Sequence, residues 1–166
     1  GPPSPYHLGF VLGPRINAGG RIGDAALGAR LLTLPDAGDA DEIADQLEAL
    51  NRERQAIETQ MLEEAVAEAQ AEMESVTPPS MLLTHSEEWH PGIVGLLASR
   101  LKDRFRRPAI AIAFDRNGKG SGSCRSLAGV DIGAAVRKAV AEGVLVKGGG
   151  HAMAAGLTQA NRGEAQ

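Results

Sequence analysis

Two short segments of the chain carry side chains that could bind a phosphate group, and the first is GSGSCRS, residues 120–126. Ser123 and Arg125 lie two positions apart, which puts both side chains on one face of a β-strand. The guanidinium can bind a phosphate as a fork while the hydroxyl donates one further hydrogen bond. A solvated arginine on an exposed strand would show the same spacing, so the spacing alone leaves both interpretations open.

The second segment is GGGHAMAAG, residues 148–156. Three consecutive glycines are unfavourable inside a helix or strand, where each costs about 1 kcal/mol relative to alanine. The sequence therefore predicts a loop in which Gly149 and Gly150 let the backbone approach a bulky anion, with the imidazole of His151 beside it. A flexible turn with a surface histidine is the alternative.

A third group of polar residues lies near the N-terminus, in GPRINAGGR, residues 13–21. Prolines and glycines interrupt any regular period here, so residues 1–35 are expected to be a loop-rich segment with one short helix. In such a loop Arg15, Asn17 and Arg21 could contact phosphates. Arginines in loops are also commonly just solvated.

The charges are strongly segregated along the sequence. Residues 36–75 contain 13 acidic and two basic side chains, a net charge of −11, whereas the rest of the chain contains eight acidic and 15 basic side chains, or +7. An acidic, solvated arm beside a moderately basic body is the expected result. A basic body suits a nucleic-acid or phosphate ligand.

Several classes of site are not expected in this chain. Divalent metals need clustered Asp, Glu or His side chains, but the carboxylates concentrate between residues 36 and 75 and the four histidines are scattered. The single cysteine, Cys124, rules out an intrachain disulfide and indicates a reducing, cytoplasmic environment. No apolar run approaches the ~20 residues of a membrane span.

A long helix is predicted over residues 36–77. Asp39 and Glu42 resemble a capping box at its start, and two prolines follow its end. One narrow apolar stripe runs along the helix, and its members are Ile43, Leu47, Leu50, Ile57 and Met61. A packed connecting helix explains this pattern better than an independent coiled-coil dimer, which remains the alternative.

Residues 78–166 alternate between strand and helix patterns and predict a small layered α/β domain, in which helices flank a mixed sheet. The expected strands are residues 81–84, 109–114, 118–126 and 155–158, and the expected helices run from Pro91 to about Arg104 and from Asp131 to Gly143.

These segments together resemble the RecJ family, bacterial exonucleases of the DHH phosphoesterase superfamily that are specific for single-stranded DNA. The resemblance rests on motifs that follow one another in the family's order and cover nearly the whole chain. They are GPRINAGGR, LNRER, WHPGIVGLLASRL with RPAIAIAF, and KGSGSCRS with GGGHAMAAG. The resemblance implies a connecting helix and a DHH-associated domain from an enzyme that hydrolyses phosphodiester bonds from a 5′ end in DNA repair and recombination.

The resemblance also implies roles for individual residues. Ser123 and Arg125 match residues that hold the 5′ phosphate region of the DNA, and His151, the candidate catalytic residue, follows glycines that face the scissile phosphate. Arg15 and Arg21 match a loop near the substrate path. The implied partners are single-stranded DNA and an N-terminal DHH domain, absent from this sequence, that holds Mn²⁺ or Mg²⁺. The fragment alone is then expected to bind no metal, to have no membrane contact and to be inactive.

Two other functions remain open at this stage. The parent protein could be a phosphatase for short oligonucleotides or 3′-phosphoadenosine phosphate, although the extended helix argues against it. Alternatively, the chain could be a non-catalytic interaction module that dimerises through its long helix.

Overall fold

The computed structural model describes residues 2–160. The chain divides into two compact units, Gly1–Ile57 and Glu58–Gln166. One long helix, α3 (Ala37–Met73), contributes residues to both. Among the described residues, no helix combines the length and the apolar character needed to cross a membrane.

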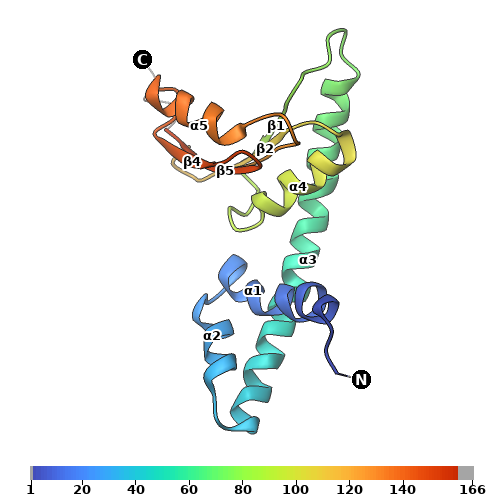
Figure 1. The fold of residues 1–166 in the computed structure, drawn as a ribbon, viewed down its shortest axis with the longest axis vertical. Helices are drawn as coiled ribbons and strands as arrows, with labels where there is room; N and C mark the ends of the chain where they lie inside the picture. Colours follow the sequence, from blue (N-terminus) through green and yellow to red (C-terminus); the bar gives the residue numbers. More distant parts are fainter. Residues whose placement is uncertain (1, 161–166) are drawn as a thin grey trace. The chain divides into compact units, whose positions relative to one another are not determined.

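The first unit is helical. A π-helical turn, η1 (His7–Leu12), leads into α1 (Gly13–Ile22) and α2 (Ala26–Thr33), and the first part of α3 completes the unit (Figure 1). The prediction of a loop-rich segment over residues 1–35 is therefore wrong.

Two properties of this segment explain the difference. Pro14 lies at the junction between η1 and α1, where the helical winding changes, and it does not interrupt the helical segment. The glycines allow the helices to pack closely: a Cβ on Gly28 of α2 would lie 2.8 Å from Cγ2 and 2.9 Å from the carbonyl oxygen of Ile16 in α1. Gly28 thus serves helix packing rather than a loop.

Helix α3 lies within the predicted range of residues 36–77 and ends at Met73, but its capping residue differs from the predicted one. The carboxylate of Asp36 accepts hydrogen bonds from the backbone N–H groups of Gly38, at 2.7 Å, and Asp39, at 3.2 Å, so Asp36 and not Asp39 caps the helix. The apolar stripe is confirmed at Ile43, Leu47 and Met61, which are buried. Three polar residues of the same helix are also buried: Asn51, Arg54 and Glu58.

The second unit contains a five-stranded mixed sheet. Its strands are β1 (Leu82–Ser86), β2 (Ala109–Phe114), β3 (Gly120–Arg125), β4 (Lys147–His151) and β5 (Ala154–Gln159). Their order across the sheet is β1-β2-β3-β5-β4; β1 and β2 are parallel and the remaining pairs are antiparallel. The predicted mixed sheet flanked by helices is confirmed.

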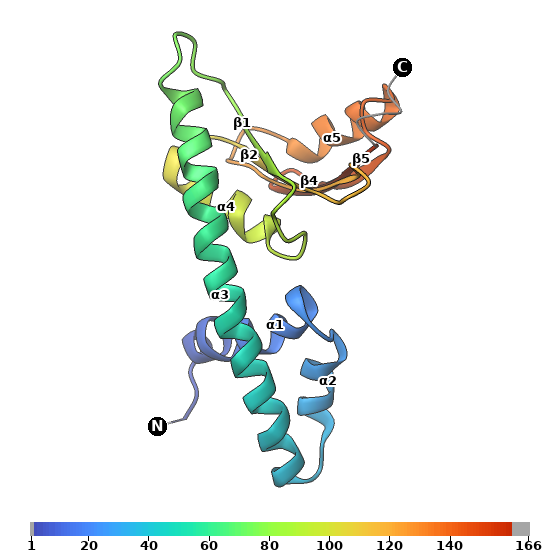
Figure 2. The same ribbon diagram turned by 180° about the vertical axis from the view of Figure 1, so that it is seen from behind.

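The two shorter helices of this unit cover opposite faces of the sheet (Figures 1 and 2). They are α4 (Val94–Phe105) and α5 (Ile132–Ala141). The side chain of Asp131 accepts the backbone N–H of Ala134 at 2.8 Å and caps α5, as predicted.

The face under α5 carries an apolar core that includes Ile112, Cys124 and Val136. Burial raises the pKa of the Cys124 thiol to about 11, against a smaller opposite effect of the Arg125 cation. Cys124 is therefore a packing residue.

The triple glycine lies in strand β4, so the prediction of a loop here is also wrong. Gly148 and Gly150 face α5, where a side chain has no room: a Cβ would lie 2.6 Å from Cγ1 of Val136 at Gly148, and 2.5 Å from the Cα of Ala155 at Gly150. Because α5 and β5 approach β4 so closely, the strand requires glycine at these positions despite its low strand propensity.

Candidate functional site

The register of the sheet brings the predicted residues of β3 and β4 to one face. Across β5, Ala154 pairs with Arg125 on one side and with His151 on the other. Two residues further along β5, Gly156 pairs with Ser123 on one side and with Gly149 on the other. Directly paired residues of antiparallel strands project to the same side of a sheet. Arg125, Ser123, Gly149 and His151 therefore share the face that α4 covers in part.

An open depression of about 560 Å³ lies on this face. Gly149 and Gly156 form part of its surface, and a Cβ on Gly149 would have no atom within 4 Å. The backbone is thus accessible to a ligand from this side. The polar side chains that line the depression come from β3, β4 and β5: Ser121, Ser123, Lys147 and Thr158.

The N-terminal end of α4 reaches the same place. Pro91 and Val94 line the depression, and no side chain caps the first turn of the helix. The amides there, with the positive end of the helix dipole, favour an anion. Gly95, one residue into the helix, lies over Arg125 and Ser123: a Cβ there would be 3.1 Å from Nη2 of Arg125 and 3.4 Å from Oγ of Ser123.

We expect Gly95→Ala to weaken binding of an anionic ligand without destabilising the fold. The added methyl group would displace the guanidinium of Arg125, whose flexible side chain can move aside, while alanine in a helix is favoured over glycine by about 1 kcal/mol. Urea denaturation should show equal or higher stability, and a binding titration should show an affinity several-fold lower. A loss of stability with unchanged affinity would contradict this role for Gly95.

The local contacts of Arg125 and His151 leave groups available for a ligand. Within the described residues, Arg125 makes one hydrogen bond, from Nη1 to the carbonyl oxygen of Cys124 at 2.9 Å. The backbone N–H of Met153 donates to Nδ1 of the exposed His151 at 3.3 Å. Nδ1 then carries the lone pair, so the neutral ring has its proton on Nε2 and can donate it to a phosphate oxygen.

Gly150 occupies a different position from the other predicted residues. It pairs with Ala155 and faces α5. Like Arg125 and His151, it does not line the depression. A Cβ on Gly133 of α5 would lie 2.9 Å from the carbonyl oxygen of Gly150. The structure thus gives Gly150 a packing position, whereas Gly149 is open to the site.

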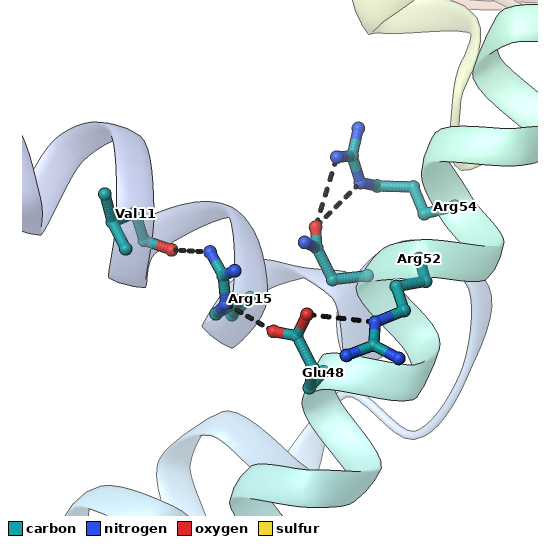
Figure 3. Close-up of polar contacts among 6 residues, drawn as sticks. Val11, Arg15, Glu48, Arg52 and Arg54 are labelled. Atoms are coloured by element: carbon teal, nitrogen blue, oxygen red, sulfur yellow. Dashed lines mark hydrogen bonds and ion pairs between the residues drawn. The ribbon is translucent and has the colours of Figure 1, made fainter.

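Arg15, Asn17 and Arg21 lie on helix α1 of the first unit and not in a loop. Arg15 is engaged in a structural contact: its Nε donates to Glu48 at 2.5 Å and its Nη1 donates to the carbonyl oxygen of Val11 at 2.7 Å (Figure 3). The hydrogen bond from Arg15, more than that from Arg52, lowers the pKa of Glu48. The charge of Arg15 is therefore largely neutralised within the protein, which sequence spacing could not show.

Figure 3 also shows the end of the LNRER segment on α3. Nε and Nη2 of Arg54 both donate to Oδ1 of Asn51, at 3.3 and 3.1 Å. Both side chains are buried, so these residues of the motif are engaged in holding the helix rather than in contacting solvent.

The described residues do not fit a divalent-metal centre. They contain no group of three or more His, Cys, Asp or Glu side chains placed to share an ion. The depression is lined by hydroxyls, a lysine and backbone groups, which are poor donors for Mg²⁺ or Mn²⁺ without carboxylates.

The residues around the predicted ones that were not identified from the sequence include Gly95, Ser121, Lys147 and Thr158. A signal for two of them was present. Ser121 precedes Ser123 and Arg125 by two and four residues, and Lys147 has the same spacing to Gly149 and His151. This period of two is visible as a shared face only when the glycines are interpreted as a strand.

The comparisons with known proteins identify the family of this chain. The family described as DHHA1 domain matches residues 78–166. The single-stranded-DNA-specific exonuclease RecJ of Salmonella typhimurium is 44% identical over 154 residues, which cover 91% of this chain and 27% of that protein. The corresponding protein of Bacillus subtilis is 38% identical over 152 residues, which cover 91% of this chain and 19% of that protein.

Solved structures that resemble this chain also belong to RecJ proteins. The crystal structure of Thermus thermophilus RecJ in complex with Mn²⁺ superimposes with a TM-score of 0.79 and 35% identity, over 93% of this chain and 22% of that one. A structure of the same protein in complex with Mg²⁺ gives a TM-score of 0.75. The chain thus spans about a quarter or less of the length of these relatives.

Proposed function

The chain belongs to the DHHA1 domain family and is RecJ-like over most of its length, and from this we propose that it is the strand-binding part of a single-strand-DNA exonuclease that hydrolyses phosphodiester bonds from a 5′ end. The observation that carries the proposal is the row across β3, β5 and β4, which puts Arg125 and His151 on one face beside an open, glycine-lined depression. DNA repair and recombination in the cytoplasm is the setting that this activity suits.

Each group at the site would contribute differently to binding. Arg125 would bind a phosphate as a fork, and Ser123 and the amides at the start of α4 would add hydrogen bonds. His151 would donate from Nε2 to the phosphate that reacts, which makes it the candidate catalytic residue. Gly149 would let the sugar-phosphate backbone lie against the sheet.

The chemistry of hydrolysis is assigned to another part of the polypeptide. A divalent ion lowers the pKa of a bound water and so supplies the nucleophile for phosphodiester cleavage. Because the described residues do not fit such an ion, we assign Mn²⁺ or Mg²⁺ to a DHH domain elsewhere in the whole protein and no metal-dependent step to this chain. The chain alone should bind DNA without cleaving it.

Binding of the 166-residue chain to a fluorescent, 5′-phosphorylated oligothymidine tests this function. We expect an affinity that is measurable at low salt and falls as salt rises, with a logarithmic slope of about −0.7 for each phosphate neutralised. The labelled strand should stay intact when Mn²⁺ is added. Absence of binding at low salt would refute the function, and degradation of the strand would refute the assignment of the metal to another domain.

A further inference from the structure

A third row of residues crosses the same face of the sheet and has no role in the site described so far. Thr158 of β5 pairs with Ser121 of β3 on one side and with Lys147 of β4 on the other. All three side chains line the depression. The row lies four residues along the strands from the row of Arg125 and His151, a distance of about 14 Å at the usual strand rise.

Within the described residues, the hydroxyls that line the depression have no protein partner. Within residues 2–160, the side chains of Ser121, Ser123 and Thr158 make no hydrogen bond. Hydroxyls elsewhere in the unit do: Oγ of Ser126 donates to the carbonyl oxygen of Val130 at 2.7 Å, and Oγ1 of Thr84 donates to that of Ile110 at 3.3 Å. The hydroxyls of the depression are therefore available to an external acceptor.

The charge at this row is also uncompensated. In the described part of the chain, the exposed Lys147 has no carboxylate within ion-pair distance, and no acidic residue lines the depression. Lys138 on α5, by contrast, forms an ion pair with Glu142 at 3.7 Å. A cation with two unpaired hydroxyls beside it and no nearby anion is complementary to a phosphate.

We propose that Ser121, Thr158 and Lys147 form a second phosphate subsite, which binds the same DNA strand beyond the phosphate held by Arg125 and His151. The proposal rests on the proposed function, because it takes the ligand to be a single strand. Consecutive phosphates of an extended strand lie closer together than the two rows, so the subsites would contact phosphates that are not neighbours. The row of Ser123, Gly156 and Gly149 lies between them and leaves room for the intervening nucleotide.

If this second subsite exists, the contribution of Lys147 to affinity depends on the length of the DNA strand. The test measures binding of 5′-phosphorylated thymidine mononucleotide and of oligothymidines of two to six nucleotides to the chain and to its Lys147→Gln variant. We expect Lys147→Gln to leave the mononucleotide affinity unchanged and to weaken the longer strands by three- to ten-fold. Its salt slope for long strands should be smaller by about 0.7, the value for one lost phosphate contact.

Lys138→Gln is the matched control, because it removes the same charge from α5 on the opposite face of the sheet. Amide NMR spectra add a second readout: the mononucleotide should shift signals near Arg125 and His151, and longer strands should also shift Ser121 and Thr158. Equal losses for all lengths, or losses equal to those of Lys138→Gln, would overturn the subsite. If no strand of any length binds the unmodified chain, the proposed function fails with it; if strands bind and Arg125→Ala weakens them while Lys147→Gln does not, only the subsite fails.

Discussion

Gly150→Ala should destabilise the second unit by about 3 kcal/mol, at the upper end of the cost of overpacking. The added Cβ would lie 2.5 Å from the Cα and 2.8 Å from the Cβ of Ala155 on the neighbouring strand. Because this Cα belongs to the backbone of β5, which pairs directly with β4 at Gly150, it cannot move away without distorting the pairing of the two strands. Thermal unfolding should show a melting temperature lower by about 6–12 °C.

The adjacent glycine provides the control for this prediction. A Cβ on Gly149 meets no atom within 4 Å, and alanine in a strand is favoured over glycine by roughly 0.5–1 kcal/mol. Gly149→Ala should therefore be as stable as the unmodified chain or more stable. The new methyl group would project into the depression and should weaken DNA binding. Equal destabilisation by the two substitutions would contradict the opposite orientations of these glycines.

Arg125→Ala should weaken binding of single-stranded DNA by about 1–3 kcal/mol, or roughly 5- to 150-fold, with little change in stability. The guanidinium is half-buried under Gly95, and its one hydrogen bond in the described structure, to the carbonyl oxygen of Cys124, is local. Fluorescence anisotropy with a labelled oligothymidine measures the affinity, and urea denaturation measures the stability.

Arg104→Ala is the control for Arg125, because Arg104 is exposed and lies in the last turn of α4, at the other end of the helix from the depression. It removes the same charge and should change the affinity only by the small amount expected from net charge. If the two variants weaken binding equally, Arg125 acts through general electrostatics and does not hold a phosphate.

The regular elements of the second unit could be predicted because their apolar patterns are local. The continuous apolar run AIAIAF identifies β2, and inward residues such as Leu97 and Leu101 identify α4. These apolar residues are buried in the structure, as the spacing of apolar residues in the sequence predicts. The shared face of Ser123 and Arg125 follows from the strand period alone.

The glycine-rich segments could not be predicted in the same way. Glycine has low intrinsic propensity for both helix and strand, yet at Gly28 and Gly148 the neighbouring Ile16 and Val136 occupy the space of a side chain. That requirement comes from tertiary packing and leaves no local signal. The ion pair of Arg15 with Glu48, 33 residues away, was hidden for the same reason.

The position of β4 in the sheet has a consequence for solubility. Within the described residues β4 pairs with β5 alone, so its other side is an edge that could recruit a strand from a second molecule. The strand is only five residues long, begins with a lysine, ends with a histidine and has no bulky apolar side chain between them. Natural sheets use short, charged edges of this kind to discourage aggregation. The composition that opens β4 to an anion thus also discourages self-association through this edge of the sheet.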